Sequence, residues 1–146
     1  MTGAAVSKLK VLVADDEPAL RKLLKTNMEL EGYVTIEAAN GAEVLESVRR
    51  DNPDIILLDI MMPVMDGWEV LTELANNPEY SQKVILVSAK ASDDAQLQGW
   101  ELGADEYITK PFDLDALLER VREVAARSEA ESEKRRAEAI SELQNL

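Results

Sequence analysis

Residues 54–63 read "DIILLDIMMP", and four consecutive large aliphatic residues in this stretch end at Asp59. An unbroken apolar run, without alternating polar residues, is typical of a strand in a parallel sheet that is covered on both faces. A carboxylate directly behind such a run needs a compensating partner, because burying an unpaired charge is costly. The stretch therefore predicts a buried strand that ends at an acid in a special environment.

Similar apolar segments alternate with amphipathic segments along the rest of the chain. We expect strands at 10–15, 34–39, 54–59, 83–89 and 105–110, and helices at 17–32, 41–51, 67–76, 93–103 and 113–127. Strands and helices that alternate in this way form a parallel sheet with right-handed crossovers and helices on both faces. The prediction is an α/β fold with a doubly wound, five-stranded parallel sheet.

Composition excludes several kinds of protein. The 146 residues suffice for one domain with a real core, and neither cysteine nor histidine is present. This excludes disulfides, thiolate or histidine metal sites and histidine-based catalytic triads, and it fits a cytoplasmic location. A net charge of −13 opposes direct binding to nucleic acid or an anionic membrane. We see no secretion signal and no apolar stretch long enough to span a membrane.

The two ends of the chain differ in character from the middle. Residues 1–7 are expected to form a flexible N-terminus. Residues 128–146 carry few large aliphatic residues, and Glu131 precedes Arg135 by four positions, a spacing that supports a helix. We expect this segment to be a charged helical extension or linker that continues the last helix, mostly solvated, in preference to a coiled-coil dimer.

Polar residues follow four of the five predicted strands. Asp15 and Asp16 end the first strand, Asp59 the third, Ser88 the fourth and Lys110 the fifth. The carboxyl ends of parallel strands share one edge of the sheet, where open α/β sheets bind ligands. If the first and third strands are neighbours, the three acids converge and repel each other unless a cation joins them. Carboxylate oxygens suit a hard divalent ion, and Mg²⁺ is the expected choice.

Lys110 and Ser88 add a positive charge and a hydroxyl donor to this edge. Together with an anionic nucleophile and a metal, they are the groups that phosphoryl transfer requires, because its catalysis is mostly positioning and charge neutralisation.

The segments "VLVADDEP", "ILLDIMMPVMDGWEVL", "VILVSA" and "GADEYITKPF" occur in the order of the motifs of a known family. Over residues 8–127 the chain strongly resembles the receiver domain of bacterial two-component response regulators, the CheY-like superfamily. The resemblance implies a flavodoxin-like (βα)5 fold with strand order 2-1-3-4-5. It also implies a cis peptide bond between Lys110 and Pro111.

The same resemblance implies a role for each site residue. Asp59 is the phosphorylation site, and it takes its phosphoryl group from a sensor histidine kinase or a histidine phosphotransfer protein. The Mg²⁺ cofactor is held by Asp15, Asp16, Asp59 and the backbone carbonyl of Met61. Lys110 and Ser88 contact the phosphate.

The resemblance also implies how the signal leaves the site. Ser88 and the switch residue Tyr107 move together, and Tyr107 turns inward. The face made by the fourth helix, fifth strand and fifth helix then changes shape and controls a protein partner. Met61 and Lys90 are candidates for tuning the rate at which water removes the phosphoryl group. Apart from its own phosphorylation and dephosphorylation, the chain is not expected to be an enzyme.

Each assignment has a structural alternative. Asp15 and Asp16 can cap the following helix, and Asp16 is the better candidate for a cap. Tyr107 can be ordinary core, and Met61 can be simple packing, as we assume for Met62. Asp66 and Gly67 are interpreted as a turn and helix start without chemistry.

The sequence is compatible with more than one way for the domain to act on a downstream target. One interpretation is a stand-alone receiver that acts through protein contacts. Another is a receiver fragment of a longer regulator, with residues 128–146 as the linker to an effector domain. A homodimer through the fourth helix, fifth strand and fifth helix is a further alternative: Arg120 matches a basic position of that dimer mode, but Asp115 stands where a base is usual.

Three other classes of protein fit the sequence less well. A phosphatase with an aspartate nucleophile usually has a second acid two residues later, where this chain has Met61. A flavodoxin-like cofactor binder needs a phosphate loop, and "ADDEP" would repel phosphate. A degenerate receiver that never takes phosphate is disfavoured by the intact acids, Ser88 and Lys110.

Overall fold

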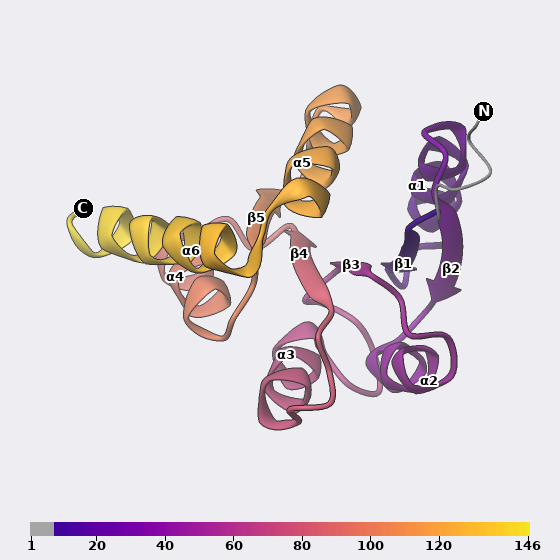
Figure 1. The fold of residues 1–146 in the computed structure, drawn as a ribbon, viewed down its shortest axis with the longest axis horizontal. Coiled ribbons are helices and arrows are strands. Elements are labelled where there is room, and N and C mark those ends of the chain that lie inside the picture. Colours follow the sequence, from indigo (N-terminus) through magenta and orange to yellow (C-terminus); the bar gives the residue numbers. More distant parts are fainter. Residues whose placement is uncertain (1–7) are drawn as a thin grey trace.

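The computed structural model describes residues 8–146, so the expectation for residues 1–7 lies outside the described part of the chain. The strands are β1 (Lys10–Ala14), β2 (Val34–Ala38), β3 (Ile55–Leu58), β4 (Lys83–Ser88) and β5 (Glu106–Thr109). The helices are α1 (Pro18–Leu30), α2 (Gly41–Asp51), α3 (Gly67–Asn76), α4 (Asp93–Glu101), α5 (Leu114–Ala126) and α6 (Glu129–Gln144) (Figure 1).

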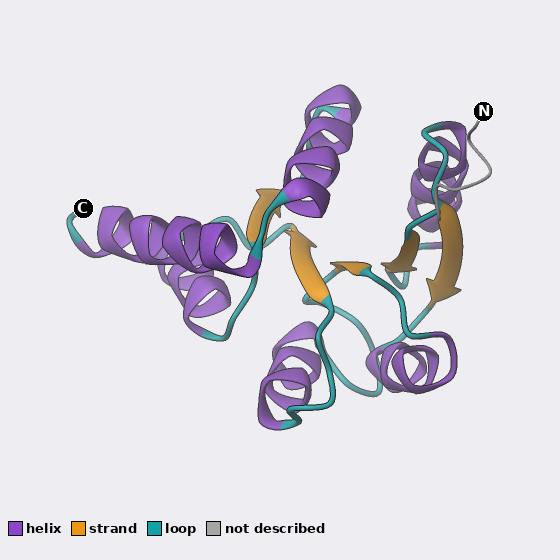
Figure 2. Ribbon diagram, in the orientation of Figure 1, coloured by secondary structure: helices purple, strands orange, loops and turns teal. Residues whose placement is uncertain are grey.

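The strands form one parallel sheet in the order β2-β1-β3-β4-β5, which confirms the predicted fold and strand order. Helices α1 and α5 cover one face, and α2, α3 and α4 cover the other (Figure 2). Strand order reverses between β1 and β3, the place where open sheets of this type leave a crevice. The register pairs Ala14 of β1 with Leu58 of β3. The next residue of each strand is an aspartate, so the register itself brings Asp15 beside Asp59.

Two apolar clusters hold the helices on the sheet, one on each face. On one face, Leu24 and Met28 of α1 and Val121 of α5 are almost completely buried against strand residues. On the other face, Val44 of α2 and Val70 of α3 are equally buried. The central strands supply side chains to both clusters, which explains why their sequence is apolar at successive positions.

The C-terminal segment differs from the expected continuous helix. Helix α5 ends at Ala126, and Arg127 adopts extended backbone angles (φ −70°, ψ 137°) before α6 begins. Ser128 Oγ accepts a hydrogen bond from the Glu131 N–H, and the Glu131 carboxylate accepts one from the Ser128 N–H. This capping box starts a new helix. The prediction of a continuation of α5 is therefore wrong, and Glu131 serves the cap instead of pairing with Arg135.

Helix α6 folds back and lies along α4 (Figure 1), a docking that we did not expect, although most of its residues are exposed as predicted. Ser132 and Ala139 are buried, and Ile140 and Leu143 pack against the apolar cluster of that face. The side of α6 that faces the domain is hard to recognise in the sequence, because several of its positions are held by polar side chains, Ser132, Arg135 and Arg136.

The peptide bond between Lys110 and Pro111 is cis, as the resemblance implied. Within residues 8–146, none of the helices has the length and apolar composition needed to cross a bilayer.

Candidate functional site

Asp59 lies directly after β3 with only 5% of its surface exposed. Its N–H donates to the Ala14 carbonyl, which extends the β1–β3 pairing by one residue, and its Oδ1 accepts from the Met61 N–H at 3.1 Å. The backbone behind it is closely packed by Gly67 at the start of α3. A Cβ at Gly67 would lie 2.6 Å from Ile60 Cα and 2.7 Å from the Asp59 carbonyl oxygen. Only glycine fits there without displacing the segment that carries the acid.

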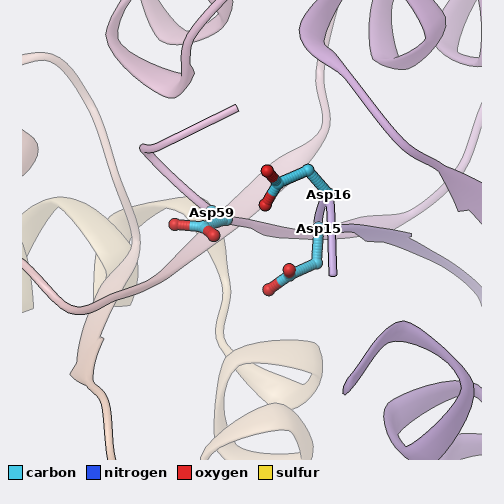
Figure 3. A group of neighbouring side chains, drawn as sticks. All are labelled: Asp15, Asp16 and Asp59. Atoms are coloured by element: carbon cyan, nitrogen blue, oxygen red, sulfur yellow. The ribbon is translucent and has the colours of Figure 1, made fainter. Parts of the chain in front are cut away.

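Asp15 and Asp16 come from the end of β1, and their side chains converge with Asp59 (Figure 3). One carboxylate oxygen from each of the three residues lies within 4.8 Å of the others. Asp15 is buried and its Oδ1 accepts from the Glu17 N–H at 2.9 Å, whereas Asp16 is exposed. The set offers hard oxygen ligands of the kind that divalent cations prefer, so this cluster could bind a metal.

The capping alternative for these acids does not hold. The N-cap residue of α1 is Glu17, and no side-chain oxygen caps the helix. By contrast, Asp66 does cap α3 by accepting from the Glu69 N–H at 2.9 Å, as expected from its place at a helix start. The interpretation of Asp66 as a structural residue is confirmed.

Lys110 reaches the same acids from the end of β5. Its Nζ lies 2.8 Å from Asp15 Oδ2 and 3.1 Å from Asp59 Oδ2. Burial alone would lower the pKa of Lys110, but its hydrogen bonds to the two carboxylates outweigh burial and raise it. Burial also raises the pKa of Asp59, although the Met61 N–H and Lys110 act in the opposite direction. A single ammonium group therefore pairs with two buried carboxylates. A net negative charge remains, which a further cation could neutralise.

Ser88 ends β4 and is completely buried, and its Oγ accepts from the Lys90 N–H at 3.2 Å. Tyr107 lies on the neighbouring strand with its ring inward, 8% exposed, and its hydroxyl donates to the Lys90 carbonyl oxygen. Burial raises the pKa of the Tyr107 phenol to about 12, so the hydroxyl stays a donor at physiological pH. Both residues therefore bind the backbone of the same residue, Lys90, one at its N–H and the other at its carbonyl.

Met61 and Lys90 have exposed side chains on the loops that follow β3 and β4. Met61 is 57% exposed, so the packing alternative does not apply to its side chain. Met62 is buried in the apolar cluster, as assumed. Arg120 and Asp115 lie on α5, and Arg120 pairs with Glu106 of its own chain at 3.3 Å.

One residue that positions the site was missed in the sequence. Arg21 of α1 donates from Nη1 to the Asp15 carbonyl oxygen at 2.7 Å, and its Nε pairs with Glu37 at 3.2 Å. It thereby links the loop with both acids to α1 and β2. An arginine on a helix carries no local signal for such a role, because the contact depends on where β2 lies.

Comparisons with known proteins agree with this arrangement. A family model described as "Response regulator receiver domain" matches residues 11–122. A probable transcriptional regulator, ycf27, of Porphyridium aerugineum is 40% identical over 122 residues, which cover 84% of this chain and 50% of the relative. A second ycf27 relative, of Guillardia theta, is 38% identical over 122 residues. The chain spans about half the length of the curated relatives it matches.

Solved structures are similar as well. The receiver domain of a Francisella response regulator superimposes with a TM-score of 0.77 at 37% identity, and the match covers 81% of this chain and 97% of that one. A chemotaxis response regulator of Vibrio cholerae gives a TM-score of 0.76 at 28% identity and covers 81% and 99% of the two chains.

Proposed function

This chain belongs to the family of response regulator receiver domains, whose general function is phosphorylation-dependent signalling, and we propose that Asp59 is its phospho-acceptor. The observation that carries the proposal is the convergence of Asp59 with two further carboxylates and with Lys110, whose Nζ lies 3.1 Å from Asp59 Oδ2. A nucleophile, a cation site and a lysine for phosphate meet at one edge of the sheet.

The residues fit Mg²⁺. Asp15, Asp16 and Asp59 offer oxygen ligands within 4.8 Å of one another, and we propose the Met61 backbone carbonyl as a fourth. Bound there, Mg²⁺ would neutralise the charge on the acids and on an incoming phosphoryl group. The donor set contains no nitrogen or sulfur ligand, which favours a hard ion over zinc or copper.

Phosphoryl transfer then follows from the placement of Asp59. A carboxylate oxygen of Asp59 attacks the phosphorus of a phospho-histidine on a kinase or phosphotransfer protein, and an O–P bond forms as the P–N bond breaks. The electron pair of that bond stays on the imidazole nitrogen, which then takes a proton. Lys110 exchanges part of its contact with the carboxylates for the new phosphate oxygens, a charge-assisted pairing. Water later attacks the phosphorus, which releases inorganic phosphate and restores the carboxylate.

Ser88 and Tyr107 would transmit the effect of phosphorylation to the β4–α4 loop. A Ser88 hydroxyl that turns to donate to the phosphate gives up its hydrogen bond from the Lys90 N–H. The Lys90 carbonyl accepts a hydrogen bond from the Tyr107 hydroxyl. The backbone N–H and carbonyl of Lys90, in the β4–α4 loop, would therefore both respond to a movement of Ser88. The inward position of Tyr107, which the family associates with activation, is the one the structure contains. Met61 and Lys90 remain the candidates for tuning hydrolysis, because their exposed side chains flank the acids and Ser88.

The wider role of the chain follows from its relatives. We propose that the switch controls a protein partner through α4, β5 and α5. A role within a longer transcriptional regulator is an alternative, since the ycf27 relatives are about twice as long as the match. We propose no catalytic turnover beyond the domain's own phosphorylation and dephosphorylation.

Acetyl phosphate with Mg²⁺ tests the proposal, with intact-mass measurement as the readout. We expect one added phosphoryl group in the wild type and in Asp115→Ala, a control at an exposed acid of α5, but none in Asp59→Ala. An unmodified wild type, or labelling that survives Asp59→Ala, would contradict the assignment. Steady hydrolysis of a phosphate ester would favour the phosphatase alternative instead.

A further inference from the structure

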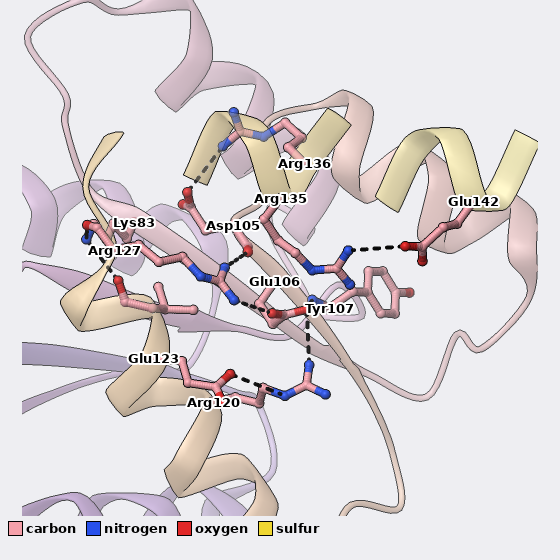
Figure 4. Close-up of polar contacts among 11 residues, drawn as sticks. Lys83, Asp105, Glu106, Tyr107, Arg120, Glu123, Arg127, Arg135, Arg136 and Glu142 are labelled. Atoms are coloured by element: carbon pink, nitrogen blue, oxygen red, sulfur yellow. Dashed lines mark hydrogen bonds and ion pairs between the residues drawn. The ribbon is translucent and has the colours of Figure 1, made fainter. Parts of the chain in front are cut away.

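Helix α6 is attached to the domain at two places (Figure 4). At the first place, Arg136 donates to the carbonyl oxygens of Gly103 and Ala104 at 3.2 and 3.1 Å. It also pairs with Asp105 Oδ1 at 3.2 Å. These acceptors form the turn between α4 and β5, where carbonyl groups past the end of a helix carry partial negative charge. The arginine therefore binds α6 to the turn that follows α4.

The second attachment of α6 is to α4 itself. The guanidinium of Arg135 lies 5.2 Å from the centre of the Trp100 ring, a cation–π contact. Ala139 is buried in the apolar cluster that contains Trp100, and Ile140 and Leu143 pack against the same cluster. Helix α6 therefore keeps both attachments only while α4 holds its present position relative to the turn.

The turn is held by the sheet. The Asp105 N–H donates to the Val84 carbonyl at 2.8 Å, and Asp105 Oδ2 accepts from the Val84 N–H at 2.8 Å. Arg127, at the break before α6, donates to the Asp105 carbonyl and pairs with Glu106 at 2.9 Å. Because the turn is fixed to β4 and β5, the docking of α6 stabilises one position of α4 relative to the sheet.

In that position α4 covers the inward ring of Tyr107. A Cβ at Gly99 would lie 2.9 and 3.1 Å from two ring atoms of Tyr107, so the helix backbone rests on the ring. Tyr107 is only 8% exposed although β5 is an edge strand, and it belongs to the same apolar cluster as Ala139. A ring that turned outward would leave a gap under α4. The inward ring, the position of α4 and the docking of α6 therefore stabilise one another.

The inward ring also holds the loop after β4. The Tyr107 hydroxyl donates to the Lys90 carbonyl, while Ser88 Oγ accepts from the Lys90 N–H. If Ser88 turns toward a phosphoryl group on Asp59, its bond with Lys90 is lost, but the bond from Tyr107 remains available to hold the loop. The ring position expected after phosphorylation is therefore present beforehand, in a chain whose α6 is docked.

We propose that the docking of α6 stabilises the inward arrangement of Tyr107, so that α6 and a phosphoryl group on Asp59 favour each other. The link to Asp59 rests on the proposed function. Two interactions that prefer the same one of two conformations each strengthen the other. Without docked α6 the inward arrangement loses part of its stabilisation. A phosphoryl group must then restore that arrangement, which lowers its apparent affinity.

A matched pair of substitutions on α6 tests the coupling. Ala139→Glu puts a carboxylate into the buried contact with α4, whereas Ala137→Glu adds the same charge to the exposed face of the helix. Beryllium fluoride with Mg²⁺ serves as the mimic of the phosphoryl group, and calorimetry measures its affinity. We expect Ala139→Glu to bind it about fivefold more weakly than the wild type, and Ala137→Glu to bind it as the wild type does. Equal affinities in the two variants overturn the coupling.

A second pair repeats the test without a charge in the apolar contact, in case Ala139→Glu is too unstable to measure. Arg136→Gln removes the hydrogen bonds to the α4–β5 turn, and Lys134→Gln removes an exposed positive charge of the same helix. We expect Arg136→Gln to bind beryllium fluoride several-fold more weakly than Lys134→Gln. Equal or tighter binding by Arg136→Gln contradicts the proposal.

Fluorine NMR of chains that contain 3-fluorotyrosine reports on the Tyr107 ring and needs no phosphoryl group. The signal of Tyr107 is assigned by its absence in Tyr107→Phe. We expect it to move toward the chemical shift of the denatured chain in Ala139→Glu but not in Ala137→Glu. A Tyr107 signal that is the same in both variants overturns the inference and leaves the proposed function standing. If acetyl phosphate labels no variant, the proposed function and the link to Asp59 fail, and the fluorine signal still decides whether α6 holds the ring.

Discussion

The Lys110 Nζ lies 3.1 Å from Asp59 Oδ2, although 51 residues separate the two in the sequence. The same ammonium also contacts Asp15 at 2.8 Å. Its removal by Lys110→Met leaves two buried carboxylates without their cation. We expect a loss of about 2–4 kcal/mol in the free energy of unfolding, as for other broken buried pairs. Urea denaturation measures the loss, and Mg²⁺ should reduce it. Lys25→Met, at an exposed pair, should change stability by less than about 0.5 kcal/mol.

The pH dependence of stability follows from the raised pKa of Asp59. The folded protein binds the proton of the Asp59 carboxyl group more tightly than the unfolded chain does. The stabilisation that this proton gives the folded state is therefore complete below the unfolded pKa and is lost as the pH rises through the folded pKa. Asp59→Asn removes the penalty for the ionised acid. We expect it to be more stable than the wild type at pH 7 and to lose this advantage below about pH 3.5, where the carboxyl group is protonated in both states. Urea midpoints at both pH values decide this, and an advantage that is constant with pH would contradict the argument.

The metal site predicts the effect of Asp15→Asn. The substitution keeps the shape of the side chain but removes one of three negative charges around the proposed cation. We expect the affinity for Mg²⁺ to fall at least about tenfold, or ~1.4 kcal/mol. Titration calorimetry measures the affinity, with Asp94→Asn, an exposed acid of α4, as the control. Equal affinities in both variants would place the cation elsewhere.

Arg21 is expected to affect Mg²⁺ binding indirectly, because it positions the loop that carries Asp15 and Asp16. Arg21→Gln loses the 2.7 Å hydrogen bond to the Asp15 carbonyl and the ion pair with Glu37. Because the acids themselves remain, we expect a smaller loss of Mg²⁺ affinity, about threefold, or ~0.6 kcal/mol. Lys22→Gln, the exposed neighbour, should bind as the wild type does. A loss in both variants would indicate a general effect of charge rather than positioning.

Gly67 is expected to tolerate no side chain. In Gly67→Ala the added Cβ meets Ile60 Cα and the Asp59 carbonyl at 2.6 and 2.7 Å, and both are backbone atoms that cannot turn aside. We expect a loss of about 1–3 kcal/mol in stability, as for overpacked cores, and weaker labelling by acetyl phosphate because Asp59 is displaced. Thermal unfolding and intact mass test the two effects, and a variant as stable as the wild type would refute the close packing.

The local sequence pattern, apolar runs that each end at a polar residue, determined the sheet and the position of its reactive edge. The unbroken run ahead of Asp59 has the signature of a strand buried on both faces, and Asp15, Ser88 and Lys110 each stand at the end of a similar run. Parallel strands end on one edge, so strand ends in the sequence are neighbours in space. The register of β1 and β3 and the cluster of three acids confirm this reasoning.

Tertiary structure alone decided the contacts that depend on two distant elements. The role of Arg21 required the position of β2, and the close contact of Gly99 with Tyr107 required α4 to rest on β5. The course of the C-terminal segment was decided in the same way. Its sequence predicts a helix, but an end at Arg127 and docking through Arg135 and Arg136 arise from acceptors and an aromatic ring on other elements. Helical periodicity records which residues share a face, whereas the partner that covers the face is set by packing across the whole fold.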